Sequence, residues 1–471
     1  MRARPLMSRH TSRVALVLLS MLLLTQTQTL YGLAGQATSN YTIDLPLIAT
    51  TPTPPSILGI DLRVSAPNGA EAYAHELGTW IRAGDMNWDQ VEATEGTYQW
   101  SVMAGFDANV ARIRAIGGEP TAIMMRTPLW ATAVAGRVCA PPSDQAIDDF
   151  ERFAEAAARR YTGALRIDIW QVGNEVDFHP NRVEDNFGSG CWGTDTAPYY
   201  GGDRYGEVLM RVAAAIRRGN PQARIIAGGL AYPNDQQEQT LGFVRGILAS
   251  GAARSFNWLS YTGYGTQGIN DMMVLRAARL REVFQASGYP NIALISAELG
   301  LTCTNAFQCP SDFQTLQAAY ASRIVAEAIA ADLSTISWYT TSLAAANDPY
   351  EHRIVDNQNG TLVPRPAFYA LRNTVDILEG AVSATGRFTG FPNQQGAVML
   401  SFTKEGRQIY VIWDPYRNGA AVWLPIASGS QVTCISQLQQ ATPTTIDCSN
   451  QVRDGLLSLT VIDPVIIQIV P

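Results

Sequence analysis

Two glutamates that follow apolar runs are the residues of this sequence best suited to chemistry with paired carboxyl groups. Glu175 closes the segment 170–175, and Glu298 closes the segment 292–298. Hydrolysis of a glycosidic bond needs one carboxylic acid that protonates the leaving oxygen and one carboxylate that attacks carbon or activates water. Glu175 and Glu298 fit that need, although each match alone also fits an ordinary solvated charge at the end of a strand.

The length and the charge limit what the chain can be. Its 471 residues exceed the roughly 250 residues of a (β/α)8 barrel, which leaves room for a small second domain. A net charge of −7 is unlike the basic surface of a nucleic-acid-binding protein. We therefore expect a neutral or weakly charged ligand and no nucleic-acid partner.

The N-terminal residues have the pattern of a targeting segment. Arginines precede an apolar run from Val14 to Leu24, which is too short to span a bilayer comfortably. We predict a secretory signal over residues 1–34, either cleaved after Ala34 or kept as a membrane anchor. A Thr- and Pro-rich linker is predicted over residues 35–56. The protein is thus expected to be secreted or held at the cell surface.

The cysteines predict disulfides and no metal site. The chain has six cysteines, and no pair of cysteines or histidines has the spacing of a zinc site. In an exported chain, three disulfides are expected, with free buried thiols as the alternative. The pairs that proximity favours are Cys303 with Cys309, Cys434 with Cys448, and Cys139 with Cys191.

The segment from residue 57 to about 372 alternates short apolar runs with longer amphipathic runs, which is typical of parallel strands joined by helices. The predicted strands are 58–64, 79–84, 121–125, 167–172, 225–229, 258–262, 292–297 and 335–340. Apolar residues at helical spacing predict helices over 144–161, 205–218, 271–287 and 312–332. This arrangement favours a closed (β/α)8 TIM barrel, over residues 57–380, rather than an open sheet.

The pattern changes after Asn373. Short alternating runs at 397–402, 408–413, 421–424 and 461–470 are separated by Gly, Asn and Pro. Such runs are typical of antiparallel strands. We predict a small C-terminal all-β sandwich over residues 381–471.

Missing residue types exclude several reactions that barrels host. The single lysine, Lys404, lies in the predicted β domain, which excludes a Schiff-base lysine in the barrel. Four histidines, one of them in the predicted signal, are too few for a histidine-rich metal site. No Gly-x-Ser-x-Gly elbow is present. We therefore expect neither a cofactor nor a metal.

One motif points to a different class of protein. Residues 263–268 match the Gly-x-Gly-x-x-Gly pattern of dinucleotide-binding loops, after a strand and before a helix. The next acid at a strand end, Glu298, lies further along than the roughly 20 residues typical of such a site. In a nucleotide-binding protein, the strand–helix units that precede this motif would also have no role. A nucleotide-dependent enzyme is therefore the weaker interpretation.

Taken together, these residues give the chain a resemblance to clan A glycoside hydrolases, among which family 39 and its relatives look nearest. The residues that agree in order are Trp80-Ile81-Arg82, Trp88, 96–100, 127–130, Asn174-Glu175, Tyr264, Glu298 and Trp338. The resemblance implies a retaining barrel enzyme, with Glu175 as the acid/base and Glu298 as the nucleophile at the ends of strands four and seven. One departure is Thr262, which stands where many members have a histidine.

Elementary electrostatics gives these residues consistent roles. The charge of Glu298 would raise the pKa of Glu175 and keep it protonated near neutral pH. The charge of Arg82 and a hydrogen bond from Tyr264 would keep Glu298 ionised. Asn174 would bind the 2-hydroxyl of the sugar, a contact that strengthens in the transition state. Each residue also has a purely structural alternative. Arg82 could form an ordinary salt bridge, Tyr264 could be a packed aromatic ring, and Asn174 could be a turn residue at the end of a strand.

Tryptophans are candidate stacking platforms, because sugars present C–H faces that pack on aromatic rings. The candidates are Trp338, Trp130, Trp88 and Trp192, and burial in the core is the alternative for each of them. The resemblance also implies that the Trp338 indole faces the cleft and that a non-proline cis peptide follows it, at Trp338–Tyr339.

The sequence therefore predicts a secreted retaining O-glycoside hydrolase that cleaves a β-linked oligo- or polysaccharide with two glutamates. The alternative is a catalytically silent carbohydrate-binding or cell-surface protein that keeps the barrel. The observation that would separate these two hypotheses is whether Glu175 and Glu298 face each other across an open cleft with room for a sugar.

Overall fold

The computed structural model describes residues 56–178, 189–194, 196–232, 237–265, 273–304, 309–342, 350–383 and 396–471. It also describes the backbone of two short strands, β1 (Ile43–Asp44) and β16 (Arg387–Phe388), which pair with each other antiparallel. The predicted signal over residues 1–34 lies outside the described residues. So does the predicted linker over residues 35–56, apart from β1 and residue 56.

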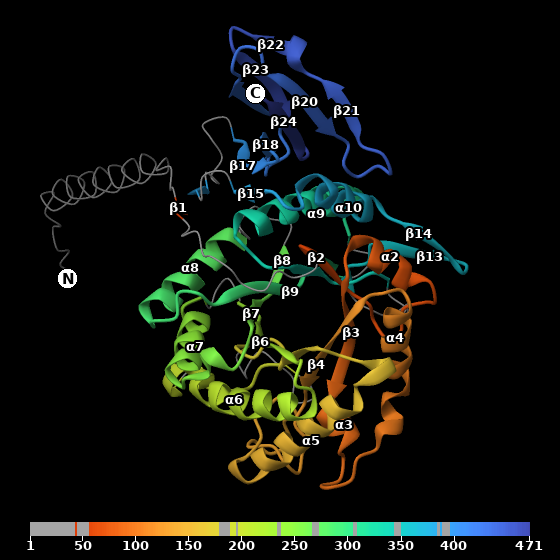
Figure 1. The fold of residues 1–471 in the computed structure, drawn as a ribbon, viewed down its shortest axis with the longest axis vertical. Coiled ribbons are helices and arrows are strands. Elements are labelled where there is room, and N and C mark those ends of the chain that lie inside the picture. Colours follow the sequence, from red (N-terminus) through yellow and green to blue (C-terminus); the bar gives the residue numbers. More distant parts are fainter. Residues whose placement is uncertain are drawn as a thin grey trace, which may run out of the picture. The chain divides into compact units, whose positions relative to one another are not determined.

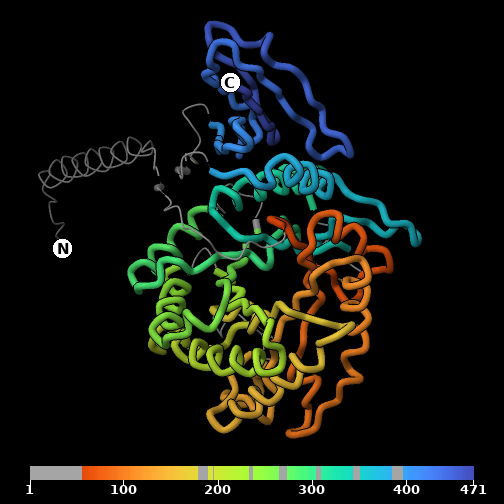
Figure 2. Tube along the Cα trace, in the orientation of Figure 1, coloured from red at the N-terminus to blue at the C-terminus, as the bar shows by residue number. Residues whose placement is uncertain are grey.

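Within the described residues, eight parallel strands close into a barrel (Figure 1). They are β2 (Leu58–Asp61), β3 (Trp80–Asn87), β4 (Glu119–Met125), β5 (Ile169–Val172), β6 (Arg224–Leu230), β7 (Trp258–Tyr261), β9 (Ala293–Leu301) and β11 (Ile336–Trp338). The ring closes because β11 pairs with both β9 and β2. Figure 2 follows the chain around this ring in sequence order. The predicted barrel is confirmed.

Helices surround the strands in Figure 1. They are α2 (Ala70–Leu77), α3 (Trp88–Val91), α4 (Ala104–Ala115), α5 (Ile147–Arg160), α6 (Gly202–Gly219), α7 (Gln237–Ala249), α8 (Met273–Ala286), α9 (Phe313–Ala330) and α10 (Pro366–Leu378). In α5 the buried apolar residues recur at helical spacing, at Ile147, Phe150, Phe153, Ala154 and Ala157. Acidic residues in its first turn and arginines in its last turn suit the helix dipole.

An apolar cluster fills the barrel at the N-terminal ends of the strands. Trp80, Ile169, Trp258 and Ala293 are each the first residue of a strand, and they pack together with Ile226 and Ile295. The rings of Trp80 and Trp258 meet edge to face at 5.0 Å between centroids. Because this end is closed, a functional site belongs at the C-terminal ends of the strands, as in other barrels of this type.

The described residues after α10 form antiparallel sheets, which confirms the predicted all-β fold. One sheet has the order β15 (Val382–Ser383), β17 (Val398–Lys404), β18 (Arg407–Trp413), β24 (Val465–Val470), β20 (Gln431–Ser436) and β21 (Thr444–Asp447). The other has the order β19 (Ala420–Pro425), β23 (Leu456–Val461) and β22 (Val452–Arg453). The sequence analysis missed β15, β20, β21, β22 and β23. We propose, as the sequence predicted, that the boundary between the barrel and the β domain lies between residues 380 and 381.

Short strands lie in the connections around the last barrel strands. They are β8 (Gly263–Gly265), β10 (Cys303–Thr304), β12 (Tyr350–Glu351), β13 (Val355–Gln358) and β14 (Thr361–Pro364). β8 continues the course of β7 and pairs in parallel with residues Leu299 to Leu301 of β9. This pairing extends β9 beyond residue 297, where the sequence predicted its end.

All three predicted disulfides are confirmed. The Cα–Cα distances are 5.4 Å for Cys139–Cys191, 5.4 Å for Cys303–Cys309 and 5.9 Å for Cys434–Cys448. The first disulfide joins the connection after β4 to the connection after β5, and the second closes a loop after β9. No helix in the described part of the chain is both long enough and apolar enough to cross a membrane.

Candidate active site

The backbone turns sharply between β5 and Glu175. Gly173 has a φ of 78°, and Glu175 itself has a φ of 45°. A Cβ atom at Gly173 would lie 2.5 Å from Cγ1 of Val176, so the turn requires glycine there. The Glu175 N–H donates to the Gly229 carbonyl, at the end of β6, over 2.7 Å. Glu175 is thereby fixed to the rim of the barrel in a conformation that non-glycine residues seldom adopt.

Glu298 lies within β9, and both of its carboxylate oxygens are bound by side chains. Arg82 Nη1, from β3, donates to Oε2 over 2.5 Å. The Tyr264 hydroxyl, from β8, donates to Oε1 over 2.5 Å. The Glu298 side chain is only 13% exposed. The structure therefore brings together three of the residues that the sequence singled out.

Opposing effects set the charge of Glu298. Burial alone would raise the pKa of its carboxyl group, because a charged group is poorly solvated there. The positive charge of Arg82 and the hydrogen bonds from Tyr264 and Arg82 outweigh burial and hold the pKa of Glu298 below its usual value. Glu298 is consequently ionised at neutral pH.

The environment of Glu175 has the opposite effect. Burial, followed by the negative charges of Glu298 and Asp177, raises the pKa of Glu175 to about 8. At neutral pH the site therefore holds one protonated and one ionised carboxyl group. A general acid and a nucleophile need these two states.

Asn174 precedes Glu175 and is oriented by its neighbours. Its Oδ1 accepts a hydrogen bond from Gln171 Nε2 over 3.0 Å. The end of β6 contains two glycines, Gly228 and Gly229, at φ values of 84° and 74°, and the second of them borders this pair. A Cβ atom on Gly229 would lie 2.7 Å from Gln171 Nε2 and 3.1 Å from Asn174 Oδ1. Gly229 thus allows the Asn174 amide to be held beside Glu175.

Asp177 holds the segments after β5 and β6 together. Its carboxylate accepts hydrogen bonds from the Ala231 N–H at 2.6 Å, the Tyr232 N–H at 3.1 Å and the Thr240 hydroxyl at 2.6 Å. Asp177 is only 4% exposed, so water cannot readily replace these contacts. The backbone that presents Glu175 therefore depends on Asp177.

We expect Asp177→Ala to lower the free energy of unfolding by about 3 kcal/mol, because three buried donors lose their acceptor at once. Thr240→Val, which removes one of the donors, should cost about 1 kcal/mol. Urea denaturation of both variants measures these costs. Equal costs for the two variants would contradict the role assigned to Asp177.

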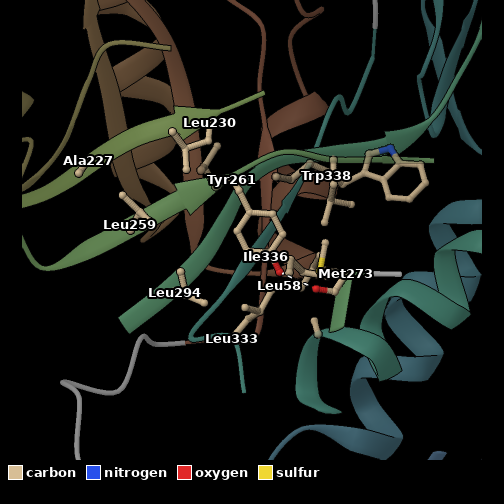
Figure 3. Close-up of a cluster of buried hydrophobic side chains, with 14 of the residues drawn as sticks. Leu58, Ala227, Leu230, Leu259, Tyr261, Met273, Leu294, Leu333, Ile336 and Trp338 are labelled. Carbon is tan, nitrogen blue, oxygen red and sulfur yellow. Dashed lines mark hydrogen bonds between the residues drawn. The ribbon is translucent and has the colours of Figure 1, made fainter. Parts of the chain in front are cut away.

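The structure corrects the prediction for Trp338. Its side chain is fully buried, its Nε1 donates to the His352 carbonyl over 3.2 Å, and its ring meets Tyr320 of α9 at 5.9 Å between centroids. Figure 3 draws Trp338 within a cluster of buried apolar side chains. The indole packs between the barrel and α9 and does not face an open cleft. The non-proline cis peptide lies at Tyr339–Thr340, one bond later than predicted.

Trp88 is also a core residue and not an open platform. It is fully buried, its ring stacks on Phe150 at 4.7 Å, and its Nε1 donates to Glu92 Oε2 over 2.6 Å. Trp130 meets the edge of Trp88 at 5.7 Å and is only half-buried, so it remains a candidate for sugar stacking. Trp192, the fourth candidate, is half-buried and packs edge-on against Tyr205.

Four residues near Glu298 were missed by the sequence analysis. They are Asp61, Arg63, Tyr339 and His352. Asp61 forms an ion pair with Arg82, and Arg63 donates to the Tyr339 hydroxyl. The Tyr339 ring meets His352 edge-on at 5.1 Å. Asp61 and Arg63 stood as charges within the predicted strand 58–64, and that signal could have identified them.

The described residues give no support to a metal site or to a dinucleotide-binding loop. Among these residues, no group of three or more His, Cys, Asp or Glu side chains is placed to hold a metal ion. Gly263 and Gly265 of the Gly-x-Gly-x-x-Gly motif belong to β8, and residues 266–272 lie outside the described residues. A Cβ atom on Gly263 would lie 2.4 Å from the terminal methyl group of Met273 in α8 and 3.1 Å from Leu299 Cβ in β9, so this glycine lies in a packed contact between β8, α8 and β9.

Comparisons with known proteins identify the fold. No family model and no curated protein matches the chain. A glycoside hydrolase family 30 endoxylanase from Clostridium papyrosolvens C71 is similar in structure, with a TM-score of 0.58 and 13% identity over 88% of this chain and 97% of that one. A family 30 subfamily 8 xylanase from Clostridium acetobutylicum is also similar, with a TM-score of 0.57 and 9% identity over 92% of this chain and 97% of that one.

A third similar structure is the α-L-arabinofuranosidase from Thermotoga maritima, in a complex with arabinose. It gives a TM-score of 0.53 and 12% identity, over 85% of this chain and 89% of that one. At such identities the similarity establishes a shared fold. The resemblance to clan A is thereby confirmed at the level of the fold, and the specific assignment to family 39 remains a hypothesis.

Proposed function

We propose that this protein is a secreted glycoside hydrolase that cleaves a β-linked saccharide with retention of the anomeric configuration. The observation that carries the proposal is the pair of partly buried glutamates with opposite pKa shifts at one end of the barrel. Glu298 is held ionised by Arg82 and Tyr264, whereas Glu175 is held protonated near neutral pH. The fold shared with solved glycoside hydrolases supports the same function.

The proposed reaction has two steps. In the first, a Glu298 oxygen bonds to the anomeric carbon as the glycosidic C–O bond breaks, and Glu175 gives its proton to the leaving oxygen. In the second, Glu175 takes a proton from water, whose oxygen bonds to the anomeric carbon and releases Glu298 as a carboxylate. Each glutamate ends the cycle in the protonation state in which it began.

The neighbouring residues support these steps. Arg82 and Tyr264 orient Glu298 by binding both of its oxygens, so its attack needs little reorganisation. Asn174, oriented by Gln171, is proposed to bind the sugar 2-hydroxyl. Trp130 is the proposed stacking platform. Three disulfides are consistent with the secreted location that we propose, because disulfides persist in oxidising compartments.

A panel of chromogenic β-xylosides, β-glucosides, β-galactosides and arabinosides tests the proposal directly. The similar xylanases and arabinofuranosidase place xylosides and arabinosides first in the panel. Release of the chromophore from one class of sugar, at a rate well above that of a Glu298→Ala variant, is the expected result. Binding of a saccharide without any release would favour the catalytically silent alternative.

The pKa shifts predict a bell-shaped dependence of kcat/KM on pH. The first step needs Glu175 protonated, so kcat/KM should fall as the pH rises through about 8. It also needs Glu298 ionised, so the acidic limb should lie below the usual range of a glutamate. Initial rates at low substrate concentration, measured from pH 3 to pH 10, define both limbs. An alkaline limb near pH 5 would contradict the role of Glu175.

A further inference from the structure

Arg82 lies between two buried carboxylates and not beside one. The parallel register of β2 and β3 pairs Asp61 with Arg82. The Arg82 guanidinium contacts Glu298 through Nη1 at 2.5 Å and Asp61 Oδ2 through Nε at 3.3 Å. The side chains are only 8% exposed for Arg82 and 4% for Asp61. Water therefore contributes little to solvating this cation, and the two carboxylates must compensate its charge.

Asp61 is fixed in place by the segment that follows β11. Its carbonyl accepts hydrogen bonds from the Thr341 N–H at 3.0 Å, the Thr340 hydroxyl at 2.8 Å and the Thr341 hydroxyl at 3.1 Å. The contact between Asp61 and Arg82 Nε is an ion pair without the geometry of a hydrogen bond. The backbone of Asp61 is thus held in place, and its carboxylate, with a Thr340 hydroxyl 3.5 Å from Oδ1, lies where the guanidinium can turn more closely to it.

The proposed reaction changes the balance of charge around Arg82. When Glu298 bonds to the anomeric carbon, its carboxylate becomes a neutral ester. Arg82 then keeps its positive charge but loses a buried partner at 2.5 Å. A buried charge without a partner is strongly destabilising, so a second counter-charge is needed at this stage of the cycle.

We propose that Asp61 is a positioning residue that supplies the counter-charge of Arg82 while Glu298 carries the glycosyl group. This inference rests on the proposed function. Asp61 acts through Arg82 and need not touch the substrate. Before the reaction it competes with Glu298 for the guanidinium, which leaves Glu298 less tightly held and more nucleophilic. After the first step it retains Arg82 in the position to which the Glu298 carboxylate returns.

Loss of the Asp61 charge therefore affects the two chemical steps differently. Without it, formation of the ester removes the remaining anionic partner of Arg82, so the first step is slowed. Breakdown of the ester restores that partner, so the second step is not slowed to the same extent. A side chain that only supported the fold would affect both steps alike.

The test uses Asp61→Asn and a 2-deoxy-2-fluoro-β-glycosyl fluoride of the sugar that the wild-type enzyme prefers. The rate of inactivation by this reagent reports the first step, and the rate of reactivation in buffer reports the second. We expect inactivation to slow by about tenfold or more, and reactivation to stay within about threefold of the wild type. The assay is run at pH 7, where Asp61, with a pKa raised to about 6 by burial, is still mostly ionised.

Asp85→Asn is the matched control. Asp85 lies on β3 like Arg82, is exposed, and also contributes a negative charge to the surroundings of Arg82. Its substitution should leave both rates unchanged. Equal slowing of both steps in Asp61→Asn, or no effect on either step, would overturn the inference while leaving the proposed function intact. A wild-type protein that hydrolyses no glycoside and is not inactivated would overturn both.

A second measurement needs no variant, in case Asp61→Asn does not fold. A crystal structure of the wild-type protein trapped with the same reagent should show Arg82 within about 4 Å of the Asp61 carboxylate while Glu298 is esterified. An Arg82 side chain that has left Asp61 in the trapped enzyme would contradict the inference.

Discussion

Glu298→Ala is expected to abolish turnover of every glycoside that the protein hydrolyses, with a loss in kcat of about 10⁵-fold or more. The substitution removes the oxygen that would bond to the anomeric carbon. It also leaves Arg82 and Tyr264 aimed at an empty position. Steady-state kinetics with the best substrate of the glycoside panel measures the loss.

The control for this variant is Glu238→Ala. Glu238 lies on α7 with a side chain 74% exposed and pairs only loosely with Arg279, at 3.4 Å. Its removal should leave kcat and KM unchanged. Glu298→Gln keeps the size of the side chain, so equal loss of activity in the Gln and Ala variants would assign the effect to the missing carboxylate. Retention of activity in Glu298→Ala would exclude this residue as the nucleophile.

Glu175→Ala should separate substrates by their leaving groups. Substrates with poor leaving groups should lose about 10³-fold in kcat/KM, because they depend on the proton of Glu175. Dinitrophenyl glycosides need no protonation, so their first step should be nearly unaffected. Kinetics with a series of aryl glycosides of increasing leaving-group pKa measures this difference.

Azide provides the second part of this test. In the Glu175→Ala variant no residue takes a proton from water, and an anionic nucleophile needs no such help. Added azide should therefore raise the turnover of dinitrophenyl glycosides and give a β-glycosyl azide. The matched control is Glu298→Ala, in which azide would attack the opposite face and give an α-glycosyl azide. No response of Glu175→Ala to azide would contradict its role as acid and base.

The barrel and the places of the two candidate glutamates could be predicted from the sequence because both depend on local patterns. A strand buried on both faces is a continuous apolar run, and the residue at its C-terminal end lies at the rim of a barrel whatever the loops do. Asn174 and Glu175, which follow the end of β5, are such residues, whereas Arg82 and Glu298 lie within β3 and β9. The disulfides were predictable because two pairs are close in sequence, 6 and 14 residues apart, and the third joins the connections that follow neighbouring strands β4 and β5.

The orientation of the tryptophans could not be predicted, because it depends on contacts between distant segments. Trp338 follows the strand-end pattern of a site residue, but Tyr320 of α9 provides a buried surface for its ring. Trp88 is likewise buried by Phe150 of α5. The charge of Asp61 in a predicted strand was visible in the sequence, but its ion pair with Arg82 was not, because the register of β2 and β3 decides that pairing.

The stereochemistry of the first-formed product tests the central claim most directly. Hydrolysis of the preferred β-glycoside, followed by proton NMR in the first minutes before mutarotation, shows which anomer is released. With Glu298 as nucleophile and Glu175 as acid and then base, the β-anomer should appear first and the α-anomer only later. First release of the α-anomer would mean a single displacement by water and would contradict the account.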